Sequence, residues 1–339
     1  MEKRPQITIK DIARELSISP STVSRALKNH PDISQKTKDS VRELANKYHY
    51  KPNAVALSLR SSKTHMIGVL IPTMVHYFFS SVISGIEHVC NEAGYNVMIC
   101  QSDENEEREI TSVQTLMSAR VDGILASVSK ETIDFSHFKE LVDDNVPLVF
   151  FDRAVQDMDT DKVIIDDVQG AFMATEHLIK MGCKKIVHLA APQNLLIGQR
   201  RKEGYFKALK QYNLPVDEHL VFKCDSREDA LVTMQEIYDN GIVPDGIFAV
   251  NDLTATGVLR VVKKNGYQIP QDVKVVGFSD GFVANVTDPT LTTIDQHGFE
   301  MGVAAANLLL RKINDEVENY SSVVKVIPVN LIKRESTED

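Results

Sequence analysis

The sequence predicts an α/β protein in which a small, all-helical N-terminal domain precedes a larger body of two doubly wound parallel sheets. From residue 66 onwards, short apolar runs rich in Val and Ile alternate with amphipathic stretches of helical length, which is typical of parallel sheets covered by helices. Eight or more strands over about 260 residues fit two sheets better than one. Before residue 64 the apolar spacing is helical instead.

Three short helices are predicted in the first 50 residues. Thr8 is a candidate N-cap with an acid three residues on, and apolar residues follow it at helical spacing. After a turn at Ser17–Ser19, Ser19 and Pro20 suit the cap and the first position of a second helix. Ser34 then caps a third helix. Three helices with so short a turn between the first two form the helix-turn-helix pattern.

The outer face of the second helix carries small hydroxyls and cations. A plain solvent-exposed face would more often carry Glu and Lys, because serine has poor helix propensity. Arg25 can pair with guanine in the major groove, while the hydroxyls and Lys28 can hold phosphates. The residues predicted to contact DNA from this domain are Thr8, Ser19, Pro20, Ser21, Thr22, Ser24, Arg25 and Lys28.

The charge distribution supports this interpretation. Residues 1–63 contain 13 of the 38 Lys and Arg but only 6 of the 47 Asp and Glu, so a basic head precedes an acidic body. Such asymmetry is expected when one small domain binds the phosphates of a nucleic acid and the rest of the chain has a different function. A basic tail without a purpose is the weaker alternative, because this segment carries folding signals.

The run ITIKDIARELSISPSTVSRAL at residues 7–27 resembles the N-terminal signature of the LacI/GalR family of bacterial regulators, and the resemblance continues through residues 34–60. It implies that Pro20, Ser21 and Arg25 read bases. One departure is a serine at position 17, where many members carry Gly or Asn, so a left-handed turn would cost more there.

The resemblance also implies a hinge helix at residues 53–59 that orders on operator DNA. It adds Asn53, Ala56 and Leu59 to the predicted DNA contacts, with Leu59 wedging into the minor groove and kinking the duplex. A helix of about seven residues is too short to be stable alone, so its folding should be coupled to DNA binding.

The body elements follow in chain order. The predicted strands are Met66–Ile71, Asn96–Cys100, Gly123–Val128, Pro147–Phe151, Val163–Ile165, Lys185–Leu189, Gly246–Val250 and Val273–Phe278. The predicted helices between them are Phe79–Ala93, Arg108–Ala119, Gly170–Met181, Gly204–Gln211, Ser226–Asn240 and Leu253–Asn265. Ligands in such folds lie beyond the C-terminal ends of the strands.

The family's body resembles a periplasmic sugar-binding protein with two lobes joined by three crossovers. The C-terminal residues resemble the family's closing strand and tail, without the heptad tail that makes some members tetramers, so a homodimer on a palindromic operator is expected. The predicted domains are a helix-turn-helix domain at 1–50, a hinge and linker at 51–63, and an effector-binding and dimerisation domain at 64–339. Its N-lobe is expected at about 64–162 and 292–324, and its C-lobe at about 163–291 and 325–339.

By the same resemblance, residues at strand ends are candidates for contact with a small effector. Phe78 and Phe79 follow the first strand, although they could be a core pair at a helix start. Asp152 and Arg153 follow another strand, although they could be an ion pair within the loop. Arg201 matches the family's ligand-contacting arginine, and Arg200 is the neighbour most easily confused with it.

Three further positions end strands or lie on a crossover. Asn251 matches a ligand position, while Asp252 could cap the next helix. Ser279 stands where many members have Asp, so either it or Asp280 could meet the ligand, and Gln296 matches a pocket position on the third crossover. The candidate effector residues are thus Phe78, Phe79, Asp152, Arg153, Arg201, Asn251, Ser279, Asp280 and Gln296.

These side chains favour a neutral polyhydroxy effector such as a sugar, because carboxylates and amides bond to hydroxyls and aromatic faces stack on sugar C–H surfaces. A purine acting as corepressor is the alternative, and a sugar phosphate would need more arginines. Leu195 and Ile197 stand where some members use polar ligand contacts, so the identity of the effector cannot be inferred from that of a relative. The sequence predicts a repressor of carbohydrate-use genes.

Other function classes find little support. The sequence shows no apolar signal segment and no stretch long enough to span a membrane. The cysteines are scattered, which predicts free thiols in the cytoplasm and no metal site or cofactor: they are Cys90, Cys100, Cys183 and Cys224. A secreted solute-binding protein would lack the basic head. No nucleotide-binding or nucleophile-elbow motif supports an enzyme, and the carboxylate run at residues 103–109 is interpreted as a polar loop and helix start, so no catalytic residue is predicted.

Overall fold

The computed structural model describes residues 7–48, 50, 63–314 and 321–338, which divide into an N-terminal unit ending at Thr64 and a body beginning at His65. The N-terminal unit contains α1 (Ile9–Glu15), α2 (Pro20–Leu27) and α3 (Gln35–Lys47). Its small core comprises Ile12, Ala13, Val23, Ala26, Val41, Leu44 and Ala45.

The three predicted helix caps are confirmed. Thr8 and Asp11 form a reciprocal capping box at the start of α1. Ser19 Oγ accepts a hydrogen bond from the Thr22 N–H at 3.1 Å, and Ser34 Oγ caps α3 in the same way. Each cap satisfies a backbone donor that the first turn of a helix leaves unpaired.

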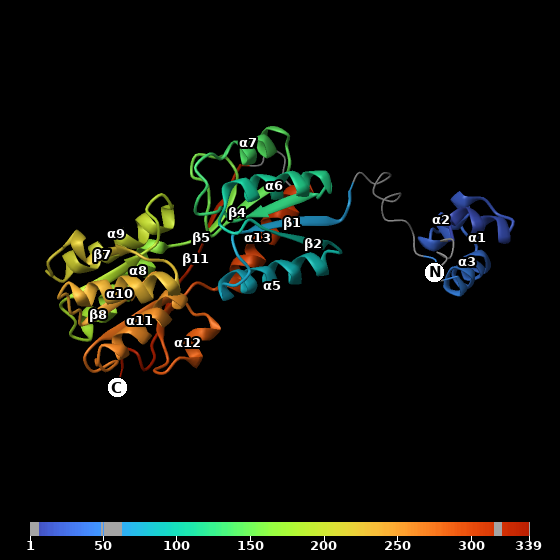
Figure 1. Ribbon diagram of the computed structural model, residues 1–339. Coiled ribbons are helices and arrows are strands. Elements are labelled where there is room, and N and C mark those ends of the chain that lie inside the picture. The colour runs from blue at the N-terminus through green and yellow to red at the C-terminus, as the bar shows by residue number, and fades with distance from the viewer. Residues whose placement is uncertain (1–6, 49, 51–62, 315–320, 339) are drawn as a thin grey trace. The chain divides into compact units, whose positions relative to one another are not determined.

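The N-lobe of the body holds a sheet in the order β11-β5-β4-β3-β1-β2, all parallel. One face is covered by α5 and α13 and the other by α6 and α7 (Figure 1). The elements are β1 (Met66–Ile71), α5 (Tyr77–Glu92), β2 (Asn96–Gln101), α6 (Glu106–Ser118), β3 (Gly123–Ala126), α7 (Ser136–Asp143), β4 (Leu148–Phe151), β5 (Asp161–Ile165), α13 (Gly298–Ile313) and β11 (Val324–Ile327).

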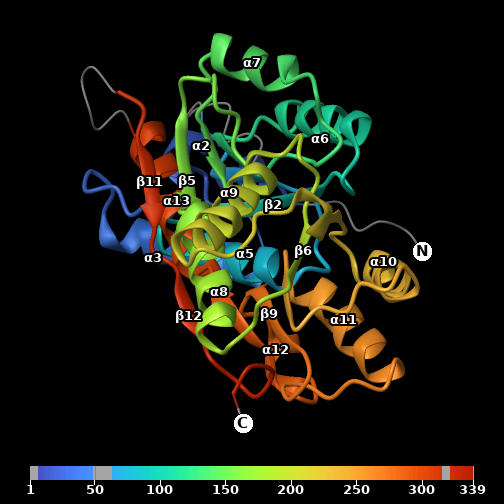
Figure 2. The same ribbon diagram turned by 90° about the vertical axis from the view of Figure 1, so that its left-hand side faces the viewer.

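The C-lobe repeats this plan with the order β12-β10-β9-β8-β6-β7. Figure 2 shows α8 and α9 on one side of its sheet and α10 and α11 on the other. The elements are α8 (Asp167–Lys180), β6 (Ile186–Ala190), α9 (Leu196–Gln211), the 3-10 turn at Glu218–Leu220, β7 (Val221–Lys223), α10 (Arg227–Asp239), β8 (Gly246–Ala249), α11 (Asp252–Lys264), β9 (Lys274–Ser279), α12 (Phe282–Val286), β10 (Thr292–Asp295) and β12 (Asn330–Ile332).

The predicted fold class is confirmed, and all eight predicted strands are present. Three strands were missed, β7, β10 and β11, as were α7, α12 and α13. The missed strands have three or four residues each, too few for a periodic signal. The closing strand that the family resemblance implied is β12, and it departs from the expected parallel pairing, because it runs antiparallel to β10 at the sheet's edge.

The lobe boundaries differ from those expected at three places. Residues 163–165 belong to β5 and residues 325–327 to β11, so both lie in the N-lobe sheet rather than the C-lobe. Residues 292–295 form β10 in the C-lobe sheet. The chain changes lobe only after each of these strands has completed its hydrogen bonds. No helix among the described residues is long and apolar enough to span a membrane.

Candidate functional site

The outward face of α2 is the first candidate site. Pro20, Ser21, Arg25 and Lys28 are exposed, and the last three recur at helical spacing along one stripe. The side chains of Arg25 and Lys28 take part in no hydrogen bond or ion pair among the described residues. Both cations are therefore available to a partner.

The hydroxyls of this region are partly committed already. Ser19 Oγ lies 2.7 Å from Ser21 Oγ and 2.8 Å from Thr22 Oγ1, and Thr8 Oγ1 donates to Asp11 at 2.6 Å. Thr22 and Ser24 are half-buried. Of the predicted DNA contacts, Asn53, Ala56 and Leu59 lie outside the described residues.

The second candidate site is a cavity of about 210 Å³ between the two lobes. It lies beyond the C-terminal ends of the central strands of both sheets, as doubly wound folds require. Eight of the nine predicted effector residues line it: Phe78, Phe79, Asp152, Arg153, Arg201, Asn251, Ser279 and Gln296.

Asp280 is the predicted residue that does not line the cavity. Its carboxylate bonds to Arg334 Nη2 at 2.7 Å. Ser279 lines the cavity instead, and its Oγ donates to Gln296 Oε1 at 2.9 Å. Ser279 and Asp280 both have positive φ, of 134° and 52°. That Ser279, rather than Asp280, meets the effector stays a prediction.

Arg201 is fixed in the wall of the C-lobe. Its Nε donates to Asp167 Oδ1 and its Nη1 to the Val250 carbonyl, both at 2.8 Å, and its guanidinium carbon lies 3.8 Å from the centre of the Phe278 ring. Burial raises the pKa of Asp167, and the charge of Arg201 opposes that rise. These contacts hold the guanidinium in one orientation at the cavity.

Asp152 and Arg153 form an ion pair within the loop, as the alternative interpretation expected, but it is a long one. Their nearest charged atoms are 4.0 Å apart, whereas Arg153 Nη1 donates to Glu104 Oε2 at 2.7 Å. Burial raises the pKa of Asp152 to about 6. Burial alone would also raise the pKa of Glu104, but Arg153 and the Lys130 N–H outweigh it and lower that pKa.

Asn251, and not Asp252, caps the helix that follows them. Asn251 Oδ1 accepts from the Thr254 N–H at 2.8 Å, and its Nδ2 donates to the Asp225 carbonyl at 2.8 Å. Asp252 is buried inside the C-lobe, where it accepts from the Gly281 N–H and from Thr293 Oγ1. Asn251 therefore combines a structural role with a place in the cavity wall.

Several cavity residues were missed by sequence reasoning, namely His76, Glu104, Lys130, Asp225 and Ser226. Glu104 belongs to the carboxylate run that had been interpreted as a polar loop. The structure confirms a loop at residues 103–105 and a helix start at Glu106, but Asp103 and Glu104 of that loop also line the cavity, and Glu109 is fully buried. The sequence signal that could have identified Glu104 as a cavity residue is the position of the carboxylate run directly after a predicted strand.

Lys130 connects the two lobes across the mouth of the cavity. Its Nζ lies 3.4 Å from Asp225 Oδ2, and its carbonyl accepts from Asn194 Nδ2 at 2.7 Å, both in the C-lobe. Its N–H donates to Glu104, the partner of Arg153, at 2.8 Å. A chain of contacts thus leads from the cavity wall to the lobe interface.

Comparison with known proteins covers both units. Residues 8–53 match the family model of bacterial regulatory proteins of the lacI family, and residues 64–335 match that of periplasmic binding proteins and the sugar-binding domain of the LacI family. The ribose operon repressor of Halalkalibacterium halodurans is 31% identical over 97% of both chains.

Two solved structures are similar over most of the fold. A lac repressor dimer bound to operator and the anti-inducer ONPF is 25% identical, with a TM-score of 0.87 over 98% of this chain and 99% of that one. A regulator from Enterococcus faecium with bound ribose is 29% identical, with a TM-score of 0.71 over 80% of this chain and 98% of that one.

Proposed function

Since the chain belongs to the LacI family of bacterial regulatory proteins, we propose that it is a dimeric repressor whose operator affinity is switched by a neutral, polyhydroxylated effector such as a sugar. It acts in the cytoplasm, where operator DNA lies, and binds its effector without turning it over. Carbohydrate-use genes are the expected targets.

The charge balance of the cavity carries the proposal for a neutral effector. Each of the three Lys and Arg side chains that line the cavity already has a carboxylate partner: Lys130 has Asp225, Arg153 has Glu104 and Arg201 has Asp167. A phosphate would need a cation without such a partner. The Asp152 carboxylate has an ion pair with Arg153 at 4.0 Å but accepts no hydrogen bond from the described residues, so it can accept one from a hydroxyl donor.

Lobe closure is the proposed means of switching. The effector contacts both lobes and so stabilises one arrangement of them over the other, which is the condition for any change in operator affinity. The contacts of Lys130 with Asp225 and Asn194 depend on that arrangement, because they form only when the lobes are close.

Binding to DNA is proposed to use two heads at once, one from each protomer. The exposed cations of α2 contact phosphates and bases, and a dimer places two such helices on the half-sites of a palindrome. Because phosphate contacts release counterions, operator affinity should fall steeply as salt is added.

A thermal-shift screen of free sugars, sugar phosphates and nucleobases on the purified chain tests the proposal. A free sugar at 100 times its dissociation constant should add about 2.7 kcal/mol of stability. The same sugar should then change operator affinity in a fluorescence anisotropy titration. Stabilisation by a nucleobase or by a sugar phosphate, with no response to free sugars, would reject the sugar assignment.

A further inference from the structure

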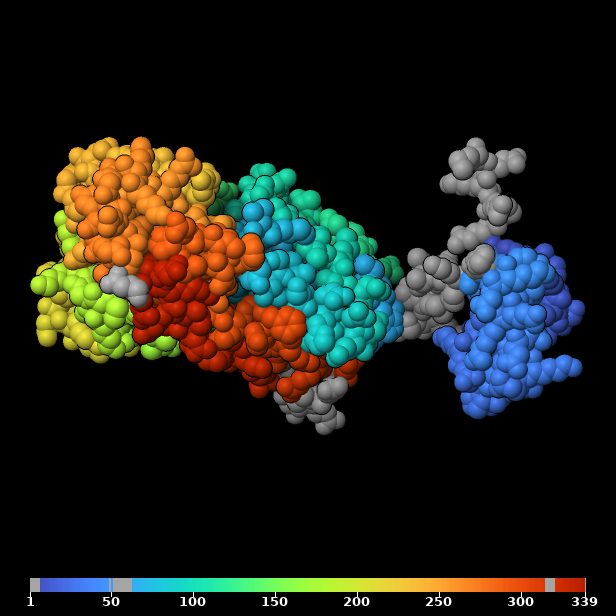
Figure 3. Space-filling view, turned by 90° about the horizontal axis from the view of Figure 1, so that it is seen from below, coloured from blue at the N-terminus to red at the C-terminus, as the bar shows by residue number. Residues whose placement is uncertain are grey.

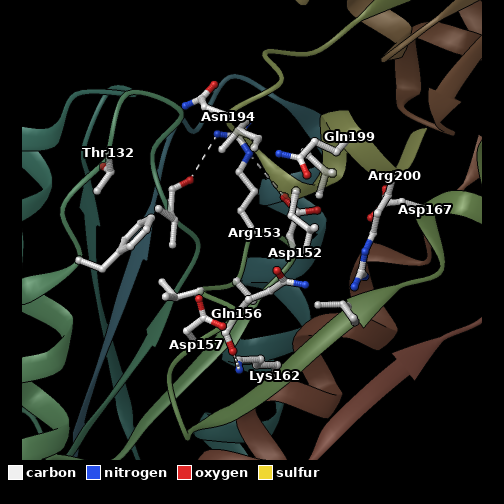
Figure 4. Close-up of a pocket in the computed structure, with 18 of the residues that line it drawn as sticks. Thr132, Asp152, Arg153, Gln156, Asp157, Lys162, Asp167, Asn194, Gln199 and Arg200 are labelled. Carbon is white, nitrogen blue, oxygen red and sulfur yellow. Dashed lines mark hydrogen bonds and ion pairs between the residues drawn. The ribbon is translucent and has the colours of Figure 1, made fainter. Parts of the chain in front are cut away.

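A second cavity, of about 500 Å³, adjoins the effector cavity, and four residues line both: Asp152, Arg153, Leu195 and Ile197 (Figure 4). We infer that the two cavities are inner and outer compartments of one extended site, and that the effector is a disaccharide or another glycoside. One sugar ring occupies the inner compartment and the second unit occupies the outer one. This inference rests on the proposed sugar-responsive function.

Asp152 is the observation that points to a ligand spanning both compartments. Its side chain is only 7% exposed, and its carboxylate accepts no hydrogen bond from any described residue. The Nε of Arg153, 4.0 Å away, is also buried without a hydrogen-bond partner. These two groups form an ion pair but no hydrogen bond, and polar groups without a hydrogen bond at such burial are costly, so a ligand is expected to supply their hydrogen-bond partners.

The position of Asp152 decides where those partners come from. Because this residue lines both compartments, its two oxygens can accept hydroxyls from sugar units on both sides of it. Leu195 and Ile197 form the apolar part of the shared wall. They stand where some members of the family use polar ligand contacts, and they suit the C–H surface at the junction between two sugar units.

Size supports the same assignment. The inner compartment, at about 210 Å³, lies below the range of roughly 300–1,000 Å³ that is usual for small-molecule pockets, whereas the two compartments together lie within it. A single compact ring fits the inner space and leaves the outer one without a ligand group.

The outer compartment offers several hydrogen-bonding groups to a second sugar unit. Asn194 and Gln199 donate their amide N–H groups to backbone carbonyls at 2.7 Å, which leaves their amide oxygens for other donors. Lys162 of the N-lobe donates to two backbone carbonyls, and Figure 4 shows Arg200 and Asp167 on the C-lobe side of the cavity. Phe135 adds an apolar surface from the opposite lobe.

The test compares matched sugars on the full chain by isothermal titration calorimetry. The probes are ribose, glucose and galactose against cellobiose, maltose, lactose and the methyl glycosides of these monosaccharides. We expect at least one disaccharide or glycoside to bind at least tenfold more tightly than its parent monosaccharide. Gln199→Trp, which fills the outer compartment from an exposed position, should remove that preference.

Gln211→Trp is the matched control, because it places the same ring on an exposed position of α9 away from both cavities and should leave the preference intact. The inference is overturned if only monosaccharides bind, or if the preference survives Gln199→Trp. Monosaccharide binding alone would leave the sugar-responsive function standing, whereas binding of no saccharide would reject both proposals.

Discussion

At the scale of single residues, the cavity contains buried polar groups that lack hydrogen-bond partners among the described residues. Asp152 is the clearest case, since burial raises its pKa from 3.8 to about 6. Between these values the folded chain binds a proton that the unfolded chain does not. Stability therefore increases as the pH falls from 6 towards 4, and above pH 6 the burial penalty is fully present.

Asp152→Asn should consequently stabilise the ligand-free chain at pH 7. The expected gain is about 1–3 kcal/mol, from a shift of roughly two pKa units at 1.36 kcal/mol each. Differential scanning calorimetry between pH 5 and 8 measures the gain and its loss at lower pH.

Asp252→Asn is the contrasting variant. Burial raises the pKa of Asp252 to about 6 as well, but this carboxylate accepts hydrogen bonds from the Gly281 N–H and Thr293 Oγ1. Its replacement should destabilise the chain, because the amide has one acceptor oxygen where the carboxylate has two, and its NH2 group would face a donor. A loss of stability at pH 7 in Asp152→Asn would show that the Asp152 charge is held by a partner.

Arg25 and Lys28 should differ in what they contribute to DNA binding. Arg25→Ala is expected to cost about 1–3 kcal/mol of operator affinity and to relax base preference at one position. Lys28→Ala should weaken all DNA about equally, because a phosphate contact carries no sequence information. Anisotropy titrations with operator and scrambled duplexes measure both, and an unchanged preference in Arg25→Ala would exclude it from base reading.

Which member of a neighbouring pair faces the cavity could not be predicted from the sequence. Strand ends and the family resemblance together gave nine candidates, and eight of them line the cavity. The choice between Ser279 and Asp280 depends on positive φ values, and Asp152 likewise has a φ of 58°. Non-glycine residues adopt such values only in particular tertiary settings, which no local pattern reveals.

At the scale of elements, the turn between α1 and α2 contains a strained position. Ser17 has a φ of 53°, in the left-handed region that favours glycine. Ser17→Gly should therefore stabilise the N-terminal unit by up to about 1 kcal/mol. Hydrogen exchange of the α1 and α2 amides in the full chain measures this as greater protection.

Ser19→Ala provides the opposite control in the same turn. It removes the side chain that accepts from the Thr22 N–H, and loss of an N-cap costs about 1 kcal/mol. Faster exchange in Ser17→Gly than in the parent chain would show that serine is not strained there.

The loop between β3 and α7 should govern lobe closure through Lys130. Lys130→Met removes the ion pair with Asp225 and keeps most of the side chain's volume. We expect effector binding about threefold to tenfold weaker, because a closed state that is less populated lowers the apparent affinity. Calorimetry with the identified effector measures this.

Small-angle X-ray scattering should also detect a more open body in the Lys130→Met variant. Lys139→Met, an exposed substitution on α7, is the control and should change neither quantity. Unaltered effector affinity in Lys130→Met would remove this residue from the switch.

One helix that the sequence missed, α13, packs against α5 through glycines. In α13, a Cβ at Gly302 would lie 2.0 Å from the Val82 carbonyl oxygen, and a Cβ at Gly85 of α5 would lie 2.1 Å from that of Phe299. These glycines let the two helices approach backbone to backbone. Glycine lowers helix propensity, so α13, with Gly298 and Gly302, gives a weaker helical pattern than α5, which has one glycine and was predicted.

At the scale of the whole molecule, alternating apolar runs were sufficient to predict two sheets, because the rhythm of strand and helix is repeated many times. The places where the chain passes between lobes were not predictable to within a few residues. They depend on where β5, β10 and β11 end their pairing, and these strands owe their register to neighbours far away in the sequence.

The surface of the body also suggests where a second copy binds. Val75 and Tyr77, at the start of α5, are 82% and 53% exposed, and Phe282 and Val286 of α12 are 66% and 59% exposed. A Cβ on Gly281 would lie 3.4 Å from Tyr77 Cβ, so these segments adjoin. Figure 3 shows the face on which α5 and the orange α11–α12 region meet. Because contiguous exposed apolar side chains are typical of protein–protein interfaces, we propose that the dimer forms across this patch.

Phe282→Glu should therefore convert the dimer into monomers. A charge at the centre of an apolar interface would be buried without a partner, which association cannot offset. Sedimentation velocity should show a species of half the mass. Operator affinity should fall by about 10²–10⁴-fold, because the second head then binds as a separate molecule.

Effector binding should survive in the same variant, because Phe282 does not line the effector cavity. Val232→Glu is the matched control, since Val232 is 59% exposed on α10 and should leave the dimer intact. A Phe282→Glu chain that remained dimeric would place the interface elsewhere. One that became monomeric yet kept full operator affinity would instead contradict the use of two coupled heads.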